Sequence, residues 1–270
     1  MKKIALALTA MAALTGSAVA ADMAPRYAKA PAPMPVAVAS WTGCYIAGGG
    51  GYGLWNQENT TYDPRTTPRT QLTATTTAGG RGYFGTVGGG CDYQFSLGNW
   101  QMVIGAFGDY DFASMKGNVV EPQFPSFGYE KLDQQWAVGG RVGMLITPSL
   151  LTYFSAGYTE AHFNSYNLFN ASLNNGPIGA ALPNYIAGKT YKGYFLGAGD
   201  EYALSFLPGL FWKTEYRFSD LDTRTNPIRV IATGLPTGTT EVDSHKYVHT
   251  VRSELVYRFN WGGSAVVAKY

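Results

Sequence analysis

Apolar and polar side chains alternate with a period of two along much of the chain beyond residue 40. In the last such segment, Tyr247, Val251 and Leu255 share one parity, and Arg252 and Glu254 share the other. This period is typical of a strand whose two faces meet different surroundings. It predicts eight strands, at residues 44–54, 81–95, 100–112, 133–147, 150–161, 189–204, 210–219 and 246–259.

Short and long connections alternate strictly between the predicted strands. Residues 96–99, 148–149 and 205–209 form the short connections. The other four connections each have 20 residues or more, at 55–80, 113–132, 162–188 and 220–245. Outer-membrane barrels alternate tight periplasmic turns with longer extracellular loops in this way. We therefore predict an all-β fold, an eight-stranded antiparallel up-and-down transmembrane β-barrel over residues 41–259.

The N-terminus has the features of a secretory signal peptide. Two lysines precede an apolar run over residues 4–14, and Ala18-Val19-Ala20 forms a small-residue cleavage site. We expect the chain in the outer membrane of a Gram-negative bacterium, with its N-terminus in the periplasm. The remaining parts are a signal peptide at 1–20, a Pro/Ala-rich periplasmic leader at 21–40 and a C-terminal extension at 260–270.

Composition separates a membrane barrel from a soluble one. Charged residues make up only 14% of the chain, against 46% hydrophobic residues, so charge is too sparse to coat a soluble barrel. The net charge of +2 provides no electrostatic footprint for nucleic acid. Aromatic residues gather near the strand ends, as a bilayer selects. The predicted girdle comprises Tyr93, Trp100, Trp212 and Tyr257 on the periplasmic side, and Trp136 and Tyr247 on the other.

The charged parity predicts the contents of the lumen. Five acids and five bases share the inward face, a balance expected of an internal salt-bridge network, because a buried unpaired charge is costly. A selective channel would more often present a ring of one sign. We interpret the lumen as closed, and a low-conductance porin for small solutes is the alternative. The ten residues are Asp109, Asp111, Glu201, Glu215, Glu254, Arg141, Lys213, Arg217, Arg252 and Arg258.

The two cysteines fall at the periplasmic side of consecutive antiparallel strands. Parity places Cys91 on the outward face, and Cys44 can share that face. Directly opposed residues have Cβ atoms about 4.5–5.5 Å apart, near disulfide geometry. Because the periplasm is oxidising, we predict a Cys44–Cys91 disulfide. Two free thiols on the apolar face are the alternative.

Six short motifs follow one another along the mature chain, at residues 41–46, 91–94, 105 with 109 and 111, 139–143, 197–202 and 255–259. In these motifs and their order, the sequence resembles the small OmpA-like outer-membrane β-barrels of alphaproteobacteria, the Omp/RopB group. The resemblance covers essentially the whole mature chain and implies an integral, surface-exposed protein, described either as a porin or as an envelope component. Phe107 departs from the family pattern, in which many members carry a lumenal glutamate. Arg252, Tyr257 and Phe259 match the spacing of the barrel-assembly signal, although Glu254 replaces its usual glycine.

Catalysis is a remote alternative. His162 and the pair Ser244-His245 lie at loop bases, where some small barrels act as acyl hydrolases or transferases, but no orienting carboxylate is identifiable in the sequence. The histidines and cysteines do not approach metal-ligand spacing, so we expect no enzyme, metal site or cofactor.

The long connections are expected to be mobile, because they contain few apolar side chains. Their basic residues either meet lipopolysaccharide or are simply solvated. The expected partners are outer-membrane lipid, lipopolysaccharide and the barrel-assembly machinery, with no nucleic acid, and the chain is expected to be a monomer. We predict a structural or surface-interaction role. The loop basic residues are Arg65, Arg69, Arg224 and Arg229.

Overall fold

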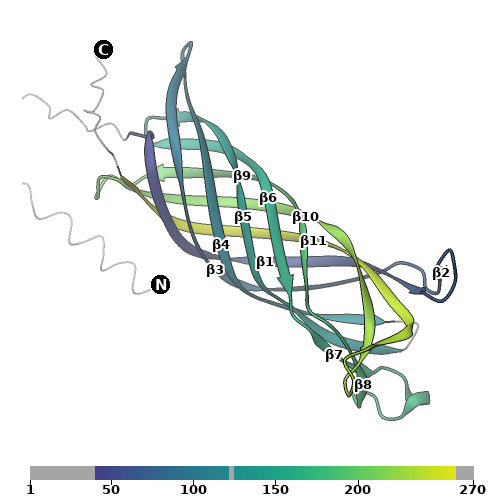
Figure 1. The fold of residues 1–270 in the computed structure, drawn as a ribbon. Helices are drawn as coiled ribbons and strands as arrows, with labels where there is room; N and C mark the ends of the chain where they lie inside the picture. The colour runs from purple at the N-terminus through teal and green to yellow at the C-terminus, as the bar shows by residue number, and fades with distance from the viewer. Residues whose placement is uncertain (1–39, 122–124, 260–270) are drawn as a thin grey trace, which may run out of the picture. The chain divides into compact units, whose positions relative to one another are not determined.

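Eight long antiparallel strands form a closed ring in the computed structural model, which describes residues 40–121 and 125–259 (Figure 1). Each long strand pairs with the next along the chain, and the last pairs with the first, with Cys44 opposite Phe259. The predicted eight-stranded up-and-down barrel is therefore confirmed. The strands are β1 (Gly43–Asp63), β3 (Thr76–Leu97), β4 (Trp100–Glu121), β5 (Ser126–Thr147), β6 (Leu150–Phe163), β9 (Lys189–Ala203), β10 (Leu210–Val230) and β11 (Pro236–Phe259).

The predicted signal peptide, nearly all of the leader and the C-terminal extension lie outside the described residues. We call the end of the barrel where β1 begins and β11 ends the turn end, because the tight connections lie there. The opposite end is the loop end. Within the described residues, no helix is long and apolar enough to cross a membrane.

Short strands continue the wall at the loop end. β7 (Tyr166–Asn170) pairs with β5, and β8 (Ala181–Ile186) pairs with both β7 and β10. They therefore extend the ring beyond the ends of β6 and β9. A further strand, β2 (Thr70–Gln71), pairs with β1, and a single 3₁₀ turn covers Leu173–Asn175.

Six of the eight long strands are much longer than the sequence pattern predicted, whereas β6 and β9 match their predicted ranges to within two residues. β4 has 22 residues and β11 has 24, whereas a bilayer crossing needs about 9–11. The prediction that 55–80, 113–132 and 220–245 are loops is therefore wrong for most of their length. The physical reason is that polar residues occupy both faces of the wall at the loop end. Gln57 points inward and Glu58 outward, so the apolar alternation ends while the strand continues.

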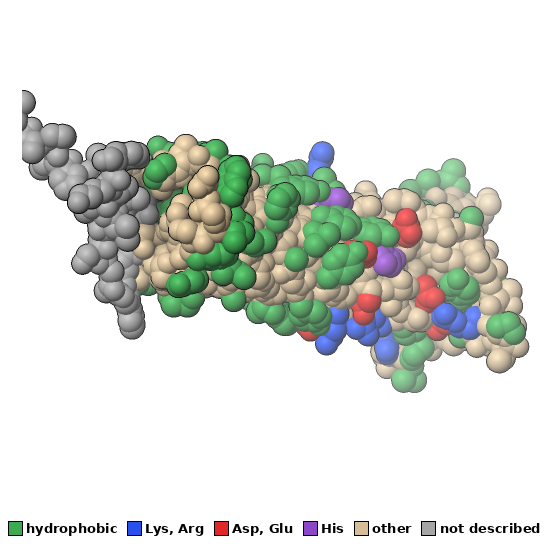
Figure 2. Space-filling view, turned by 90° about the horizontal axis from the view of Figure 1, so that it is seen from above, with side chains coloured by type: hydrophobic (Ala, Val, Ile, Leu, Met, Phe, Trp, Pro, Cys, Tyr) green, Lys and Arg blue, Asp and Glu red, His purple; other side chains and the backbone are tan. Residues whose placement is uncertain are grey.

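The outer surface changes character along the barrel. Hydrophobic side chains gather toward the left of Figure 2, and most charged side chains toward the right. The apolar half contains exposed residues such as Ile104, Phe154 and Leu196, each more than half exposed. Large exposed apolar area of this kind requires an apolar solvent.

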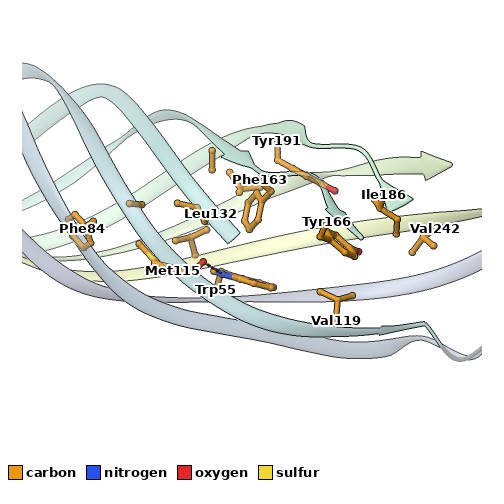
Figure 3. Close-up of a cluster of buried hydrophobic side chains, with 14 of the residues drawn as sticks. Trp55, Phe84, Met115, Val119, Leu132, Phe163, Tyr166, Ile186, Tyr191 and Val242 are labelled. Atoms are coloured by element: carbon orange, nitrogen blue, oxygen red, sulfur yellow. Dashed lines mark hydrogen bonds between the residues drawn. The ribbon is translucent and has the colours of Figure 1, made fainter. Parts of the chain in front are cut away.

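Two apolar clusters fill the interior, one in each half. The loop-end cluster is drawn mostly from the predicted loops, and includes Trp55, Met115, Val119 and Leu132 (Figure 3), together with Ile228. The expectation that those connections lack packing is therefore wrong. The turn-end cluster packs eight buried side chains: Trp41, Tyr45, Ala47, Val103, Leu151, Tyr153, Phe211 and Val256.

Adjacent glycines on β5 provide a test of how tightly the wall is packed. A Cβ on inward-facing Gly139 would lie 2.4 Å from the Ala156 carbonyl oxygen and 2.7 Å from Cζ of Phe195. A Cβ on Gly140 would meet only the Gly105 oxygen, at 3.5 Å. We expect Gly139→Ala to reduce the free energy of unfolding by about 1–3 kcal/mol. Gly140→Ala should change it by about 0.5 kcal/mol or less.

Urea unfolding of the refolded variants in detergent micelles measures both values. Equal effects of the two substitutions would contradict the packing argument, because the two sites differ in the space beside the backbone rather than in the residue replaced.

Candidate functional site

The barrel interior is the part of the molecule in which polar chemistry is concentrated. Every charged residue predicted for the lumen points inward, with a side chain at most 6% exposed. Their strands place them there because inward residues alternate with outward ones. The ten side chains are those of Asp109, Asp111, Arg141, Glu201, Lys213, Glu215, Arg217, Arg252, Glu254 and Arg258.

Four of the buried charges close a ring of ion pairs near the turn end, which we call the four-charge ring. Arg141 pairs with Asp92 at 2.5 Å and with Glu201 at 2.8 Å. Arg258 pairs with the same two carboxylates, each at 2.6 Å. The four residues come from β3, β5, β9 and β11, so the ring ties together strands on different sides of the lumen.

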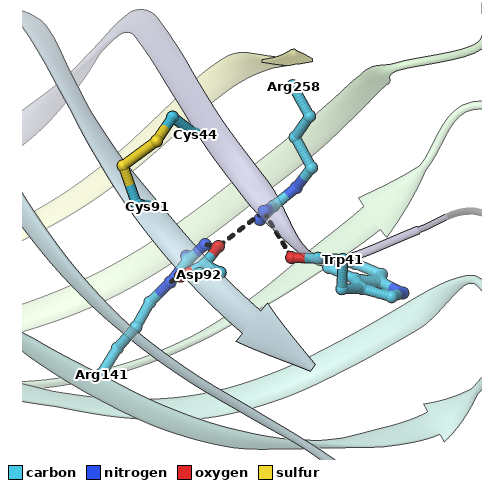
Figure 4. The surroundings of a disulfide bond; sticks show 6 residues. All are labelled: Trp41, Cys44, Cys91, Asp92, Arg141 and Arg258. Atoms are coloured by element: carbon cyan, nitrogen blue, oxygen red, sulfur yellow. Dashed lines mark hydrogen bonds and ion pairs between the residues drawn. A yellow bond between two sulfur atoms is a disulfide. The ribbon is translucent and has the colours of Figure 1, made fainter. Parts of the chain in front are cut away.

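Asp92 was missing from the predicted network, although parity places it inward beside outward-facing Cys91. Figure 4 shows its carboxylate between Arg141 and Arg258. The alternation of inward and outward residues along β3 indicates an inward Asp92, but the predicted charge network did not extend to the end of that strand.

Trp41 covers the four-charge ring on the turn-end side. Its side chain is fully buried, and its ring lies 4.8 Å from that of Phe211. The indole Nε1 donates to the Pro148 carbonyl at 3.3 Å, and the Trp41 carbonyl accepts from Arg258 at 3.1 Å. The residue therefore folds from the start of the barrel back into its lumen.

A second group of charges occupies the middle of the lumen. Arg217 pairs with Asp109 at 2.9 Å and with Glu215 at 2.8 Å. Arg252 pairs with Asp111 at 2.9 Å and also approaches Asp109 at 3.2 Å. Lys213 on β10 and Glu254 on the neighbouring strand β11 complete the group, with 2.8 Å between the ammonium Nζ and the carboxylate Oε2.

Phe107, which departs from the family pattern, also faces the lumen. The Arg217 guanidinium lies 5.5 Å from the Phe107 ring centroid and 4.3 Å from that of Phe195. A cation over an aromatic face is favourable when desolvated. The aromatic pair therefore accommodates the guanidinium where the resemblance implies a carboxylate.

Lys246 forms a third charged site in the loop-end half, and it was absent from the predicted network. Its ammonium pairs with Glu130 at 2.9 Å and donates to Gln57. It lies 4.2 Å from the Phe163 ring centroid and 4.9 Å from that of Tyr191.

These layers give the interior a mixed charge pattern rather than a ring of one sign. Each layer joins acids to bases, and apolar side chains from both clusters lie between the charges and the two ends. Such an arrangement cross-links strands and fills the lumen, since eight strands enclose an interior just wide enough for side chains.

The cysteine pair lies on the outer surface. Cys44 and Cys91 are directly opposed on β1 and β3, and their sulfurs are bonded. Non-reducing tryptic digestion followed by mass spectrometry should recover the two linked peptides from protein isolated without reductant, because the periplasm is oxidising. Quantitative alkylation of both thiols without prior reduction would exclude the disulfide.

The predicted aromatic girdle residues all lie on the outward parity. Tyr93, Trp100, Trp212 and Tyr257 are exposed near the turn end. Farther along the wall, outward Trp136 packs against Tyr158 with ring centroids 5.6 Å apart. Tyr247 stacks with Phe218, with ring centroids 6.1 Å apart.

The candidate Ser244-His245 acyl site is not assembled. Ser244 points into the lumen and donates to Asn59 at 2.6 Å, whereas His245 points outward. Instead, His245 Nε2 lies 2.8 Å from Asp220, and its Nδ1 lies 3.0 Å from the Thr223 hydroxyl. Thr223 sits at the bulge where β10 shifts register against β11. The histidine therefore bridges the two strands at an irregular step in their ladder.

His162 has a carboxylate partner that the sequence pattern did not reveal. Its Nδ1 lies 2.8 Å from Asp133 on the adjacent strand β5. Within the described residues, no group of three or more His, Cys, Asp or Glu side chains is placed to hold a metal ion.

The loop arginines, which were expected either to meet lipopolysaccharide or to be solvated, have partners within the chain. Arg65 pairs with Asp63 at 2.7 Å, and its hydrogen bonds lower the pKa of Asp63 to about 2. Arg224 pairs with Asp222 at 2.8 Å. Arg69 pairs with Glu241 and Asp243, and Arg229 donates to the Gly234 carbonyl.

The closed antiparallel ring, its apolar outer half and its filled lumen define an integral outer-membrane β-barrel protein. No family model matches the sequence. The 31 kDa outer-membrane immunogenic proteins of Brucella melitensis biotype 1 and Brucella suis biovar 1 are 31% identical over 263 residues, covering 96% of this chain and 100% of each relative. The chain belongs to the family of these proteins. It is located in the outer membrane of a Gram-negative bacterium and has a surface or envelope role.

Solved structures with similar folds include three outer-membrane proteins. OprG from Pseudomonas aeruginosa has a TM-score of 0.46 at 12% identity, covering 82% of this chain and 99% of that one. The protease OmpT from Escherichia coli has a TM-score of 0.36 at 11% identity, covering 80% and 97%. Ail, the attachment invasion locus protein of Yersinia pestis, has a TM-score of 0.28 at 12% identity, covering 76% and 98%.

Proposed function

We propose that the protein is a closed, monomeric scaffold of the outer membrane, whose role is exerted by its walls and its loop end rather than by transport. The observation that carries the proposal is the sequence of layers in the lumen. The four-charge ring and Trp41 occupy the turn-end half, and Lys246 with its aromatic neighbours occupies the other half. A continuous water-filled channel through the lumen would form only if these contacts were broken.

The proposal includes an orientation. The turn end and the N-terminus face the periplasm, and the loop end faces the exterior, because short turns are periplasmic in this class of barrel. The Brucella relatives are named as immunogenic, which suits an exterior loop end. With about 9–11 residues needed to cross the bilayer, roughly half of each of the six longest strands projects beyond it, and a smaller part of β6 and β9, which have 14 and 15 residues.

Planar-bilayer recording tests the closed lumen. We expect the purified, refolded protein to give no stable conductance steps, since opposite charges and apolar side chains fill its interior. The matched control is a known porin refolded by the same procedure. Stable steps from this protein would support the alternative, a low-conductance porin for small solutes.

We also propose that the protein is not an enzyme. Its inward Ser244 and outward His245 support this, as does the strand-bridging position of His245. The order of its motifs supports the finer assignment to the OmpA-like Omp/RopB group. Lipid, lipopolysaccharide and the barrel-assembly machinery are the proposed partners. For the assembly machinery, Arg252, Tyr257 and Phe259 remain the proposed signal, with both aromatic side chains on the outer face.

A further inference from the structure

Three basic side chains lie side by side on the outer wall of β3, β4 and β5. Arg81 is directly opposite Lys116, and Lys116 is directly opposite Lys131. All three are on the outward parity, and neighbouring strands are about 4.8 Å apart. The three cations therefore form a row roughly 10 Å long, which we call the basic row.

The basic row has no counter-ion among the described residues: no side-chain hydrogen bond or ion pair joins any of its members to another residue. Several other outward basic residues have acidic partners, as Lys192 has in Glu160 and Arg224 in Asp222. The nearest outward acid along β5 is Asp133, which pairs with His162. Like charges at directly opposed positions destabilise a sheet. The basic row is therefore unfavourable for folding, which indicates that it binds a partner outside the chain.

The position of the row along the wall indicates where such a partner is found. Leu54 is directly opposite Arg81, and one outward position closer to the turn end lie Tyr52 and Tyr83, whose rings are 4.9 Å apart. Such aromatic pairs mark the membrane–water interface. The basic row thus stands just beyond the apolar band, at the height of lipid headgroups.

The wall beside the row is hollowed. An open groove of about 480 Å³ is lined by Leu54, Arg81 and Lys116, and by glycines that contribute no side chain, including Gly79 and Gly117. A bulky headgroup can approach the backbone there, while apolar chains attached to it lie along the aromatic face below.

We propose that the basic row and its groove bind the phosphorylated headgroup of lipid A, the glycolipid anchor of lipopolysaccharide. This rests on the proposed orientation, in which the loop end faces the exterior. Phosphate groups supply the missing negative charge, and Arg and Lys both bind phosphate oxygens. Lipid A joins phosphates to several acyl chains in one molecule, which matches a cationic row directly above an apolar wall.

The test uses two triple variants that each remove three positive charges. R81Q/K116Q/K131Q removes the basic row, and R65Q/K192Q/R224Q removes three cations that have acidic partners. Both are refolded in detergent free of lipid A, and native mass spectrometry measures binding of purified diphosphoryl lipid A. We expect at least about tenfold weaker binding by the row variant, and less than about twofold change in the control.

Two further probes identify the ligand. Dephosphorylated lipid A should bind the wild-type protein as weakly as intact lipid A binds the row variant. Phosphatidylglycerol should bind at least about tenfold more weakly than lipid A, because it offers one phosphate to three cations. Equal binding of lipid A by both variants, or equal binding of phosphatidylglycerol and lipid A by wild type, would overturn the proposal.

The proposed closed scaffold is tested separately on the same preparations. Circular dichroism verifies that both variants are folded, planar-bilayer recording reports on the lumen, and protease protection in intact cells reports on the loop end. Conductance by wild type would refute the closed lumen and leave the lipid A result intact. Loss of the lipid A difference would refute the basic-row site while the lumen stayed closed.

Discussion

Replacing Arg141 by methionine should reduce the free energy of unfolding by about 3–5 kcal/mol, because it leaves buried carboxylates without one of their partners. Arg141 donates two hydrogen bonds to Asp92 and one to Glu201, and both carboxylates are fully buried. Arg258 remains, but it then faces two acids alone. Urea unfolding of the refolded barrel, followed by tryptophan fluorescence, measures the change.

Lys192→Met is the matched control. Lys192 also pairs with a glutamate, at 3.2 Å, but its side chain is 51% exposed. Loss of an exposed pair should cost about 0–1 kcal/mol. The double variant Arg141→Met/Asp92→Asn should recover part of the loss, since it removes one uncompensated charge. An Arg141→Met variant as stable as Lys192→Met would show that the four-charge ring does not hold the strands together.

Trp41→Ala should also cost about 3–5 kcal/mol, through the loss of a large, fully buried side chain and its packing on Phe211. The four-charge ring and the loop-end cluster stay in place in this variant. We therefore expect the variant to lose stability while remaining non-conducting. Urea unfolding and planar-bilayer recording on one preparation provide both measurements.

Trp100→Ala is the control for Trp41→Ala. Trp100 is 60% exposed on the outer wall near the turn end, so its removal in detergent should cost about 1 kcal/mol or less. If both tryptophan variants lost equal stability, Trp41 would not be packed inside the lumen. If Trp41→Ala conducted, the seal would lie at the turn end alone rather than in successive layers.

The sequence predicted the membrane-embedded half of the fold well, because lipid imposes a rule on every residue there. Outward Trp212 and Tyr216 must be apolar or aromatic, and inward Lys213 and Glu215 need partners inside. The same parity placed Cys44 and Cys91 on one face, where the structure joins them. It failed beyond the bilayer, where Gln57 and Glu58 differ in direction but not in polarity.

By itself, then, the sequence determined the class of fold, the chain order of the long strands and the inward direction of ten lumenal charges, since all three follow from an apolar solvent outside a narrow barrel. Only the tertiary structure decided which acid meets which base. Asp92 and Arg258 are 166 residues apart in the chain, and closure of the ring between β11 and β1 brings them together. The structure likewise decided that the Arg65 side chain has a partner while that of Arg81 has none among the described residues, because pairing depends on the neighbouring strand as well as on residue type.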